Sequence, residues 1–197
     1  MIINSKKALK WLIEGNIDYI TAKSNHRGDI SIEKRLHTHN HGQNPYAVVI
    51  CCSDSRVIPE NIFMAGIGDL FVIRLAGNVV GDFAIGSIEY AISHLNIKLI
   101  MVMGHTMCGA VHAAITNHHE SYITSIINEI QGAIGKCSDN TQASKLNVYN
   151  TIERIKQSSI IKEYLEQDVE IVGSIYHTYS GEVEILRKRR TKKKEGQ

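Results

Sequence analysis

The stretch Tyr46-Ala47-Val48-Val49-Ile50-Cys51-Cys52 is an unbroken apolar run that is rich in β-branched residues. Runs of this kind are typical of strands that are covered on both faces, as in parallel sheets flanked by helices. The run ends directly before the polar residues Ser53-Asp54-Ser55. We therefore expect a buried strand of an α/β sheet, followed at its carboxyl end by side chains that can carry chemistry.

Strands and helices are expected to alternate along the rest of the chain. Apolar residues recur at three- and four-residue steps from Ser5 to Ala22, which predicts an amphipathic helix. Comparable patterns predict helices at residues 82–95, 108–118, 121–134 and 143–166, and strands at 46–52, 69–75, 97–103, 169–176 and 182–186. Asp82 is the predicted N-cap of the first of these helices. The pattern favours an α/β fold, with a mostly parallel central sheet flanked by helices, an antiparallel edge strand and an N-terminal helical arm.

The size and charge of the chain predict one domain with a basic tail. The chain has 197 residues, of which 43% are hydrophobic, which suits one well-buried core over residues 1–186. Residues 187–197 contain seven of the 22 basic residues and one of the 20 acidic ones, so the remainder has 15 basic and 19 acidic residues, a net charge of −4. The tail is predicted to be disordered. A mildly acidic body makes nucleic acid an unexpected partner.

The compartment expected from the sequence is the cytoplasm. No apolar run approaches the ~20 residues of a membrane helix, and the first ten residues lead into no signal-peptide core. Four cysteines are few for a disulfide scaffold, so metal binding or catalysis is the better interpretation of Cys51, Cys52, Cys108 and Cys137.

Residues with catalytic potential gather after two of the predicted strands. Cys52 ends the strand at 46–52 and is followed by Asp54 and Arg56, and His105 and Cys108 come after the strand at 97–103. Sites in α/β sheets form at the carboxyl ends of the strands, and two thiolates with one imidazole suit a catalytic zinc site that keeps a fourth position open. Spacing alone leaves another interpretation open, in which the cysteines are buried apolar residues and the histidine is a hydrogen-bonded turn residue.

The exact amino-acid sequence of these two segments favours the zinc interpretation. Cys52-Ser53-Asp54-Ser55-Arg56 and His105-Thr106-Met107-Cys108-Gly109-Ala110 resemble the two signatures of beta-class carbonic anhydrases. The resemblance spans roughly residues 43–186 and includes further similar segments at 68–74, 76–78 and 86–91. It implies an enzyme that converts carbon dioxide and water reversibly to bicarbonate and a proton by means of zinc-bound hydroxide.

The resemblance also implies a role for each site residue. Cys52, His105 and Cys108 would bind one Zn²⁺ per subunit, and Asp54 and Arg56 would form a catalytic dyad beside it. A bidentate pair with Arg56 can hold Asp54 ionised and off the metal, so that Asp54 orients the attacking oxygen.

Pocket residues are implied by similarity to the plant-like members, whose zinc site is open. Gln43, Phe71 and Tyr90 match pocket positions of that subtype, and Gly109 of the second signature is assigned to the same pocket. Val49 stands where the other subtype, whose aspartate can move onto zinc, often has tryptophan. We therefore expect the open form.

The resemblance also implies an oligomer, and two alternative functions stay open. Family members are dimers or larger, with an N-terminal helix laid over the partner, so a homodimer is the expected minimum and the helix at Ser5 to Ala22 the expected arm. One alternative is hydrolysis of carbon disulfide or carbonyl sulfide at the same site. Another is a non-catalytic zinc module, with four protein ligands, whose basic tail contacts nucleic acid.

Three histidines and one cysteine near the first predicted strand are not expected to bind metal. His37, His39 and His41 alternate in a polar segment and are expected to be solvated rather than to bind metal. Consecutive side chains of a strand point to opposite faces, so Cys51 is expected to face away from Cys52.

Overall fold

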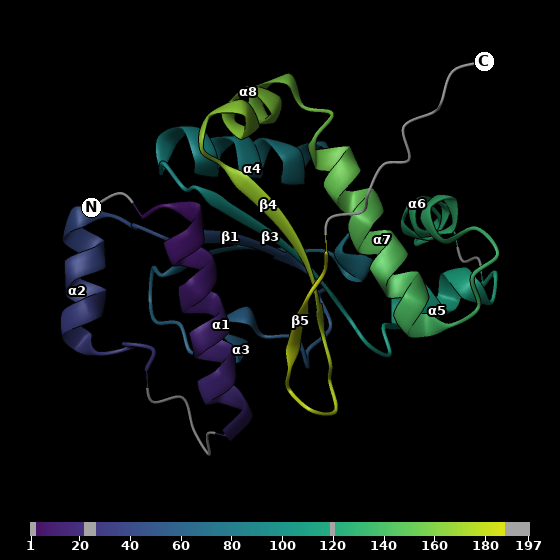
Figure 1. The fold of residues 1–197 in the computed structure, drawn as a ribbon, viewed down its shortest axis with the longest axis horizontal. Helices are drawn as coiled ribbons and strands as arrows, with labels where there is room; N and C mark the ends of the chain where they lie inside the picture. The colour runs from purple at the N-terminus through teal and green to yellow at the C-terminus, as the bar shows by residue number, and fades with distance from the viewer. Residues whose placement is uncertain (1–2, 22–26, 119–120, 188–197) are drawn as a thin grey trace.

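The computed structural model describes residues 3–21, 27–118 and 121–187. A five-stranded sheet with the order β2-β1-β3-β4-β5 forms its centre (Figure 1). The first four strands are parallel, and β5 pairs antiparallel with β4. The strands are β1 (Ala47–Cys51), β2 (Leu70–Arg74), β3 (Leu99–His105), β4 (Glu170–Tyr176) and β5 (Val183–Ile185). The predicted α/β fold with an antiparallel edge strand is confirmed.

Helices cover both faces of this sheet, as Figure 1 shows. They are α1 (Ser5–Thr21), α2 (Ile32–His41), α3 (Pro59–Ile62), α4 (Asp82–His94), α5 (Gly109–Ile115), α6 (Thr124–Ile134), α7 (Asn140–Ile155) and α8 (Ser159–Gln167), with a short 3-10 turn at Ala76–Asn78. Within the described residues, none of these helices has both the length and the apolar character needed to cross a membrane.

Alternating side chains of the strands divide the core into two layers. On one face, Ile100 and Val102 of β3 pack with apolar residues of α4, α7 and α8. On the other face, Met101 and Met103 of the same strand pack with α1 and α3. A third cluster joins α5 and α6 beside the carboxyl ends of β1 and β3. Because β1 and β3 are buried along their whole length, their carboxyl ends are held firmly in the middle of the sheet.

Two expectations about helix boundaries were wrong. The helix predicted over residues 143–166 is two helices, α7 and α8, because the Ser158 hydroxyl accepts a hydrogen bond from the Ile161 amide and caps a new helix. Ser158 also donates to Glu89 at 2.6 Å, which fixes this corner against α4. Asp82 is the first residue of α4 rather than its N-cap, which is Gly81. Its carboxylate still lies in the first turn, where negative charge is favourable.

Helix α2 was not predicted, because it has no buried residue and therefore no apolar periodicity. Ser31 caps it by accepting from the amide of Lys34 at 3.0 Å. His37 and His41 stack one turn apart on its surface, and both are exposed. Exposure of these rings agrees with the interpretation of solvated histidines.

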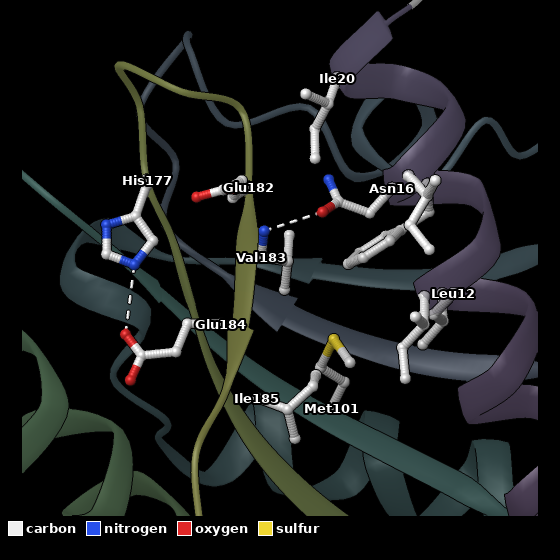
Figure 2. A pocket seen from close by; sticks show the side chains of 12 residues that line it. Leu12, Asn16, Ile20, Met101, His177, Glu182, Val183, Glu184 and Ile185 are labelled. Carbon is white, nitrogen blue, oxygen red and sulfur yellow. Dashed lines mark hydrogen bonds and ion pairs between the residues drawn. The ribbon is translucent and has the colours of Figure 1, made fainter.

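Helix α1 packs on the sheet of its own chain. The buried side chain of Asn16 accepts from the amide of Val183 at 2.8 Å, as Figure 2 shows. It also donates to the carbonyl of Gly181 at 2.8 Å. These bonds occupy part of the free edge of β5, which would otherwise offer unpaired backbone groups. The expectation that this helix lies over a partner subunit stays a prediction, as does the single domain over residues 1–186. Ala22 and residues 188–197 of the predicted basic tail lie outside the described residues.

Candidate metal centre

Parallel pairing of β1 and β3 brings their carboxyl ends to the same edge of the sheet. Cys51 lies opposite Met103 in the register, so Cys52 and His105 leave their strands side by side. A turn at Met107, which has a positive φ of 57°, returns the chain so that Cys108 precedes α5. The ligand atoms of Cys52, His105 and Cys108 all lie within 4.8 Å of one another, and all three residues are buried. No other group of three histidine, cysteine or acidic residues of the described chain has this geometry.

The imidazole of His105 is oriented for a metal. Its Nδ1 lies 3.0 Å from the carbonyl of Thr106, which can only accept, so Nδ1 carries the proton. Its Nε2 is buried and has no hydrogen-bond partner. An unprotonated buried nitrogen beside two thiols is the arrangement that a metal ion would satisfy. The residues present therefore fit zinc.

The two thiols favour a thiolate at Cys52. A hydrogen bond from Cys108 is the largest cause that lowers the pKa of Cys52, and the amides of Asp54 and Gly77 also donate to its sulfur, at 3.4 and 3.3 Å. The same interaction, together with burial, raises the pKa of Cys108. A second thiolate here therefore needs a nearby cation, which a divalent metal would provide. Cys51 instead lies in the apolar layer under α1, on the opposite face from Cys52, as expected.

Asp54 lies beside this group without joining it. Its Oδ2 is 4.0 Å from Nε2 of His105, and both of its carboxylate oxygens accept from Arg56. Hydrogen bonding to the Arg56 guanidinium is the largest cause that holds the pKa of Asp54 far below its ordinary value. Asp54 is therefore an ionised acceptor fixed at the rim of the ligand cluster.

Comparison with known proteins agrees with this geometry. The family model for carbonic anhydrase matches residues 47–183. The chain belongs to the carbonic anhydrase family. The carbonic anhydrase of Mycolicibacterium smegmatis is 34% identical over 194 residues, which cover 92% of this chain and 93% of that protein. Carbonic anhydrase 2 of Mycobacterium tuberculosis is 38% identical over 136 residues, which cover 66% of this chain and 65% of that protein.

Solved structures place the chain in the beta class of the family. The beta-carbonic anhydrase CafA of Aspergillus fumigatus has a TM-score of 0.72 at 28% identity, over 78% of this chain and 81% of that one. The beta-carbonic anhydrase CcaA has a TM-score of 0.69 at 27% identity, and the match covers 90% of this chain and 94% of that one. The resemblance seen in the sequence motifs is confirmed, and with it the expectation of an enzyme.

Arg74 is a site residue of this carbonic anhydrase that the sequence analysis did not single out. From the end of β2 its guanidinium donates to the carbonyls of Cys52, at 3.3 Å, and Asp54, at 2.8 Å. These two bonds fix the loop that carries the first ligand and the carboxylate. The only sequence signal was its place in the similar segment 68–74, where an exposed strand-end arginine is otherwise unremarkable.

The predicted pocket residues are not all gathered at the ligand cluster. Gly109 follows Cys108 as the exposed first residue of α5. Gln43 is exposed and precedes β1, at the strand end opposite Cys52. Phe71 pairs with Val48 near that same end, and its ring lies 6.3 Å from that of Tyr90 on α4. Within one chain, Gln43, Phe71 and Tyr90 lie apart from the three candidate ligands. Their role in a substrate pocket therefore stays a prediction.

A cavity of about 380 Å³ lies elsewhere, between α1 and the β4–β5 hairpin (Figure 2). Leu12 and Met101 form part of its apolar wall, and His177 and Glu184 pair at 3.2 Å on its hairpin side. None of the three ligand residues lines it. This cavity is therefore separate from the metal centre.

Proposed function

We propose that this carbonic anhydrase family member hydrates carbon dioxide reversibly to bicarbonate and a proton, with one zinc ion held by Cys52, His105 and Cys108. The buried, unpartnered Nε2 of His105 between two cysteine sulfurs is the observation that carries the proposal. Two thiolates and one imidazole form a donor set that zinc prefers, and three protein ligands are typical of its catalytic sites. When bound, zinc would supply Lewis-acid chemistry that makes water nucleophilic near neutral pH.

Asp54 and Arg56 then orient the reaction. An ionised carboxylate can only accept hydrogen bonds, so Asp54 accepts from the attacking water and fixes the direction of its lone pair toward carbon dioxide. Arg56 keeps Asp54 charged and holds both of its oxygens. The same two bonds support the open form of the site, in which Asp54 is not a ligand.

We also propose that the active unit is a homodimer or a larger oligomer. Gln43 before β1, Phe71 near the start of β2 and Tyr90 on α4 lie apart from the ligands of their own chain, so they would act in the site of a neighbouring subunit. Exposed isoleucines on α1, among them Ile17 at 58%, offer apolar surface for such an interface. Sedimentation velocity checks this, because an active monomer would contradict it. We propose the cytoplasm as the compartment of this protein. Its reducing conditions keep cysteines as the free thiols that the metal site needs.

Metal analysis combined with stopped-flow carbon dioxide hydration tests the function. Wild-type protein is expected to contain one zinc per chain and to be active. Cys52→Ala is expected to lose zinc and activity, whereas Asp54→Ala keeps zinc and loses turnover. Cys137→Ala is the matched control, because Cys137 lies outside the cluster, and it is expected to retain both properties.

Zinc-loaded wild-type protein without hydration activity would overturn the proposal. Running the same protein with carbonyl sulfide and carbon disulfide separates hydration from the alternative hydrolase activity.

A further inference from the structure

Helix α7 carries a stripe of polar side chains on its buried side. Asn140, Ser144, Asn147 and Thr151 recur at steps of four, three and four residues, which places them on one face of the helix. The last three are 1%, 0% and 2% exposed. Burying polar groups costs free energy unless they form hydrogen bonds, so a stripe of this kind inside a core requires a reason.

The first residue of the stripe holds the backbone of a zinc ligand at two points. The Oδ1 of Asn140 accepts from the amide of Cys108 at 3.2 Å, and its Nδ2 donates to the carbonyl of the same residue at 3.3 Å. Both backbone groups of Cys108 are thus fixed by one side chain. Asn140 lies 32 positions further along the chain, so this contact joins two distant segments.

The next two residues of the stripe reach the other two ligands. Ser144 donates to the carbonyl of His105 at 3.2 Å. Asn147 donates to the carbonyl of Gly77 at 2.6 Å, and the amide of Gly77 in turn donates to the sulfur of Cys52 at 3.3 Å. Each of the three ligands is therefore connected to α7 directly or through one residue.

Two glycines allow α7 to lie close enough for these contacts. A Cβ atom on Gly104 of β3 would lie 2.8 Å from a methyl group of Val148, and one on Gly173 of β4 would lie 2.9 Å from the other. Figure 1 shows α7 beside the carboxyl ends of these strands, with α5 and α6 next to it. The missing side chains thus set the distance between α7 and the sheet at the level of the metal centre.

We propose that Asn140, Ser144 and Asn147 are positioning residues for zinc, which preorganise the three ligands although none of them touches the metal. The inference rests on the proposed zinc site. Hydrogen bonds that hold ligand backbones in place before binding reduce the ordering that the metal must impose, so zinc binds more tightly. A purely structural stripe would instead stabilise the fold equally with and without zinc.

The test compares zinc affinity with the stability of the metal-free protein. The variants are Asn140→Ala, which lies at the half-buried start of α7, and Ser144→Ala, which removes one hydroxyl. The matched control is Asn150→Ala on the same helix, because Asn150 donates to Glu129 of α6 and to none of the ligand-bearing residues. Competition with a chromophoric chelator measures zinc affinity, and thermal unfolding measures the stability of the metal-free protein.

Both test variants are expected to bind zinc about tenfold more weakly than wild type or worse. Their cobalt-substituted forms are expected to show shifted visible bands, because the ligand geometry changes. Wild-type zinc affinity and spectra in both variants would overturn the inference. It would also be overturned if Asn150→Ala lost zinc affinity as well, with the loss in all three variants simply following the decrease in the stability of the metal-free protein. Failure of the wild-type protein to bind zinc would instead overturn the proposed function, so the two failures are distinguishable.

Discussion

Arg56 holds the carboxylate of Asp54 with two parallel hydrogen bonds, from Nε to Oδ1 at 2.9 Å and from Nη2 to Oδ2 at 2.7 Å. Its Nη2 also donates to the carbonyl of Met107 at 3.2 Å. Met107 lies between His105 and Cys108, two of the three candidate metal ligands. Arg56 therefore ties the carboxylate that follows β1 to the loop that follows β3.

Arg56→Lys is expected to lower kcat/KM for carbon dioxide hydration by about 10–100-fold, because misplacing a catalytic group by even 1 Å has effects of this size. Lysine is a single point charge and cannot reproduce the bidentate pair. Zinc content should stay at the wild-type level, since Arg56 is not a ligand. Stopped-flow hydration with metal analysis makes the measurement, and the exposed Arg35→Lys on α2 is the control. Wild-type kinetics in Arg56→Lys would show that the paired geometry is dispensable.

Removal of zinc by a chelator is expected to abolish hydration and lower the unfolding temperature while leaving the far-ultraviolet circular dichroism nearly unchanged. Ligand binding stabilises the folded state by mass action, so loss of the metal must lower stability. The two main core layers, however, are built from the sheet and helices without the ligands. Adding zinc back should restore activity. A metal-free chain that unfolds completely would show that the metal is needed for folding itself.

Glu184→Gln is expected to lower stability at neutral pH by less than about 1 kcal/mol, because the pair with Lys145 is partly exposed. A hydrogen bond from Lys145 at 2.8 Å is the largest cause that lowers the pKa of Glu184, and His177 adds to it. A carboxyl group with a lowered pKa stabilises the folded state above its ordinary pKa of 4.5 and loses this effect as the pH falls below that value.

Urea titrations of both proteins between neutral pH and pH 3 check this dependence. The stability difference from wild type should be present at neutral pH and should disappear in acid. A difference that grows in acid would contradict the assignment.

Gly104→Ala is expected to lower the free energy of unfolding by about 1–3 kcal/mol, the usual cost of overpacking a core. The new methyl group would lie 2.8 Å from a methyl group of Val148 and 2.9 Å from one of Ile175, so these side chains, or the helix and strand that carry them, would have to move. Gly132→Ala in α6 is the control, because nothing lies within 4 Å of the added atom and alanine favours helix. Urea denaturation measures both. Equal stability of Gly104→Ala and wild type would show that α7 does not depend on the close approach.

Local sequence patterns predicted the sheet well because buried strands leave continuous apolar runs. The runs at 46–52 and 97–103 became β1 and β3, and Cys52 and His105 at their carboxyl ends met at one edge, as parallel pairing requires. Patterns were less informative about α2, which buries nothing, and about the break near Ser158, where one hydroxyl ends one helix and starts the next. Neither feature leaves a signal in apolar periodicity.

The sequence by itself determined the family, the order of the strands along the chain and the candidate metal ligands Cys52, His105 and Cys108. Tertiary structure alone decided that Asn140 would hold Cys108, that Arg74 would hold the loop after β1, and that Asn16 would occupy the edge of β5. The physical reason is that apolar periodicity records which side chains avoid water, whereas a hydrogen bond between a side chain and a distant backbone depends on where folding brings the two segments together.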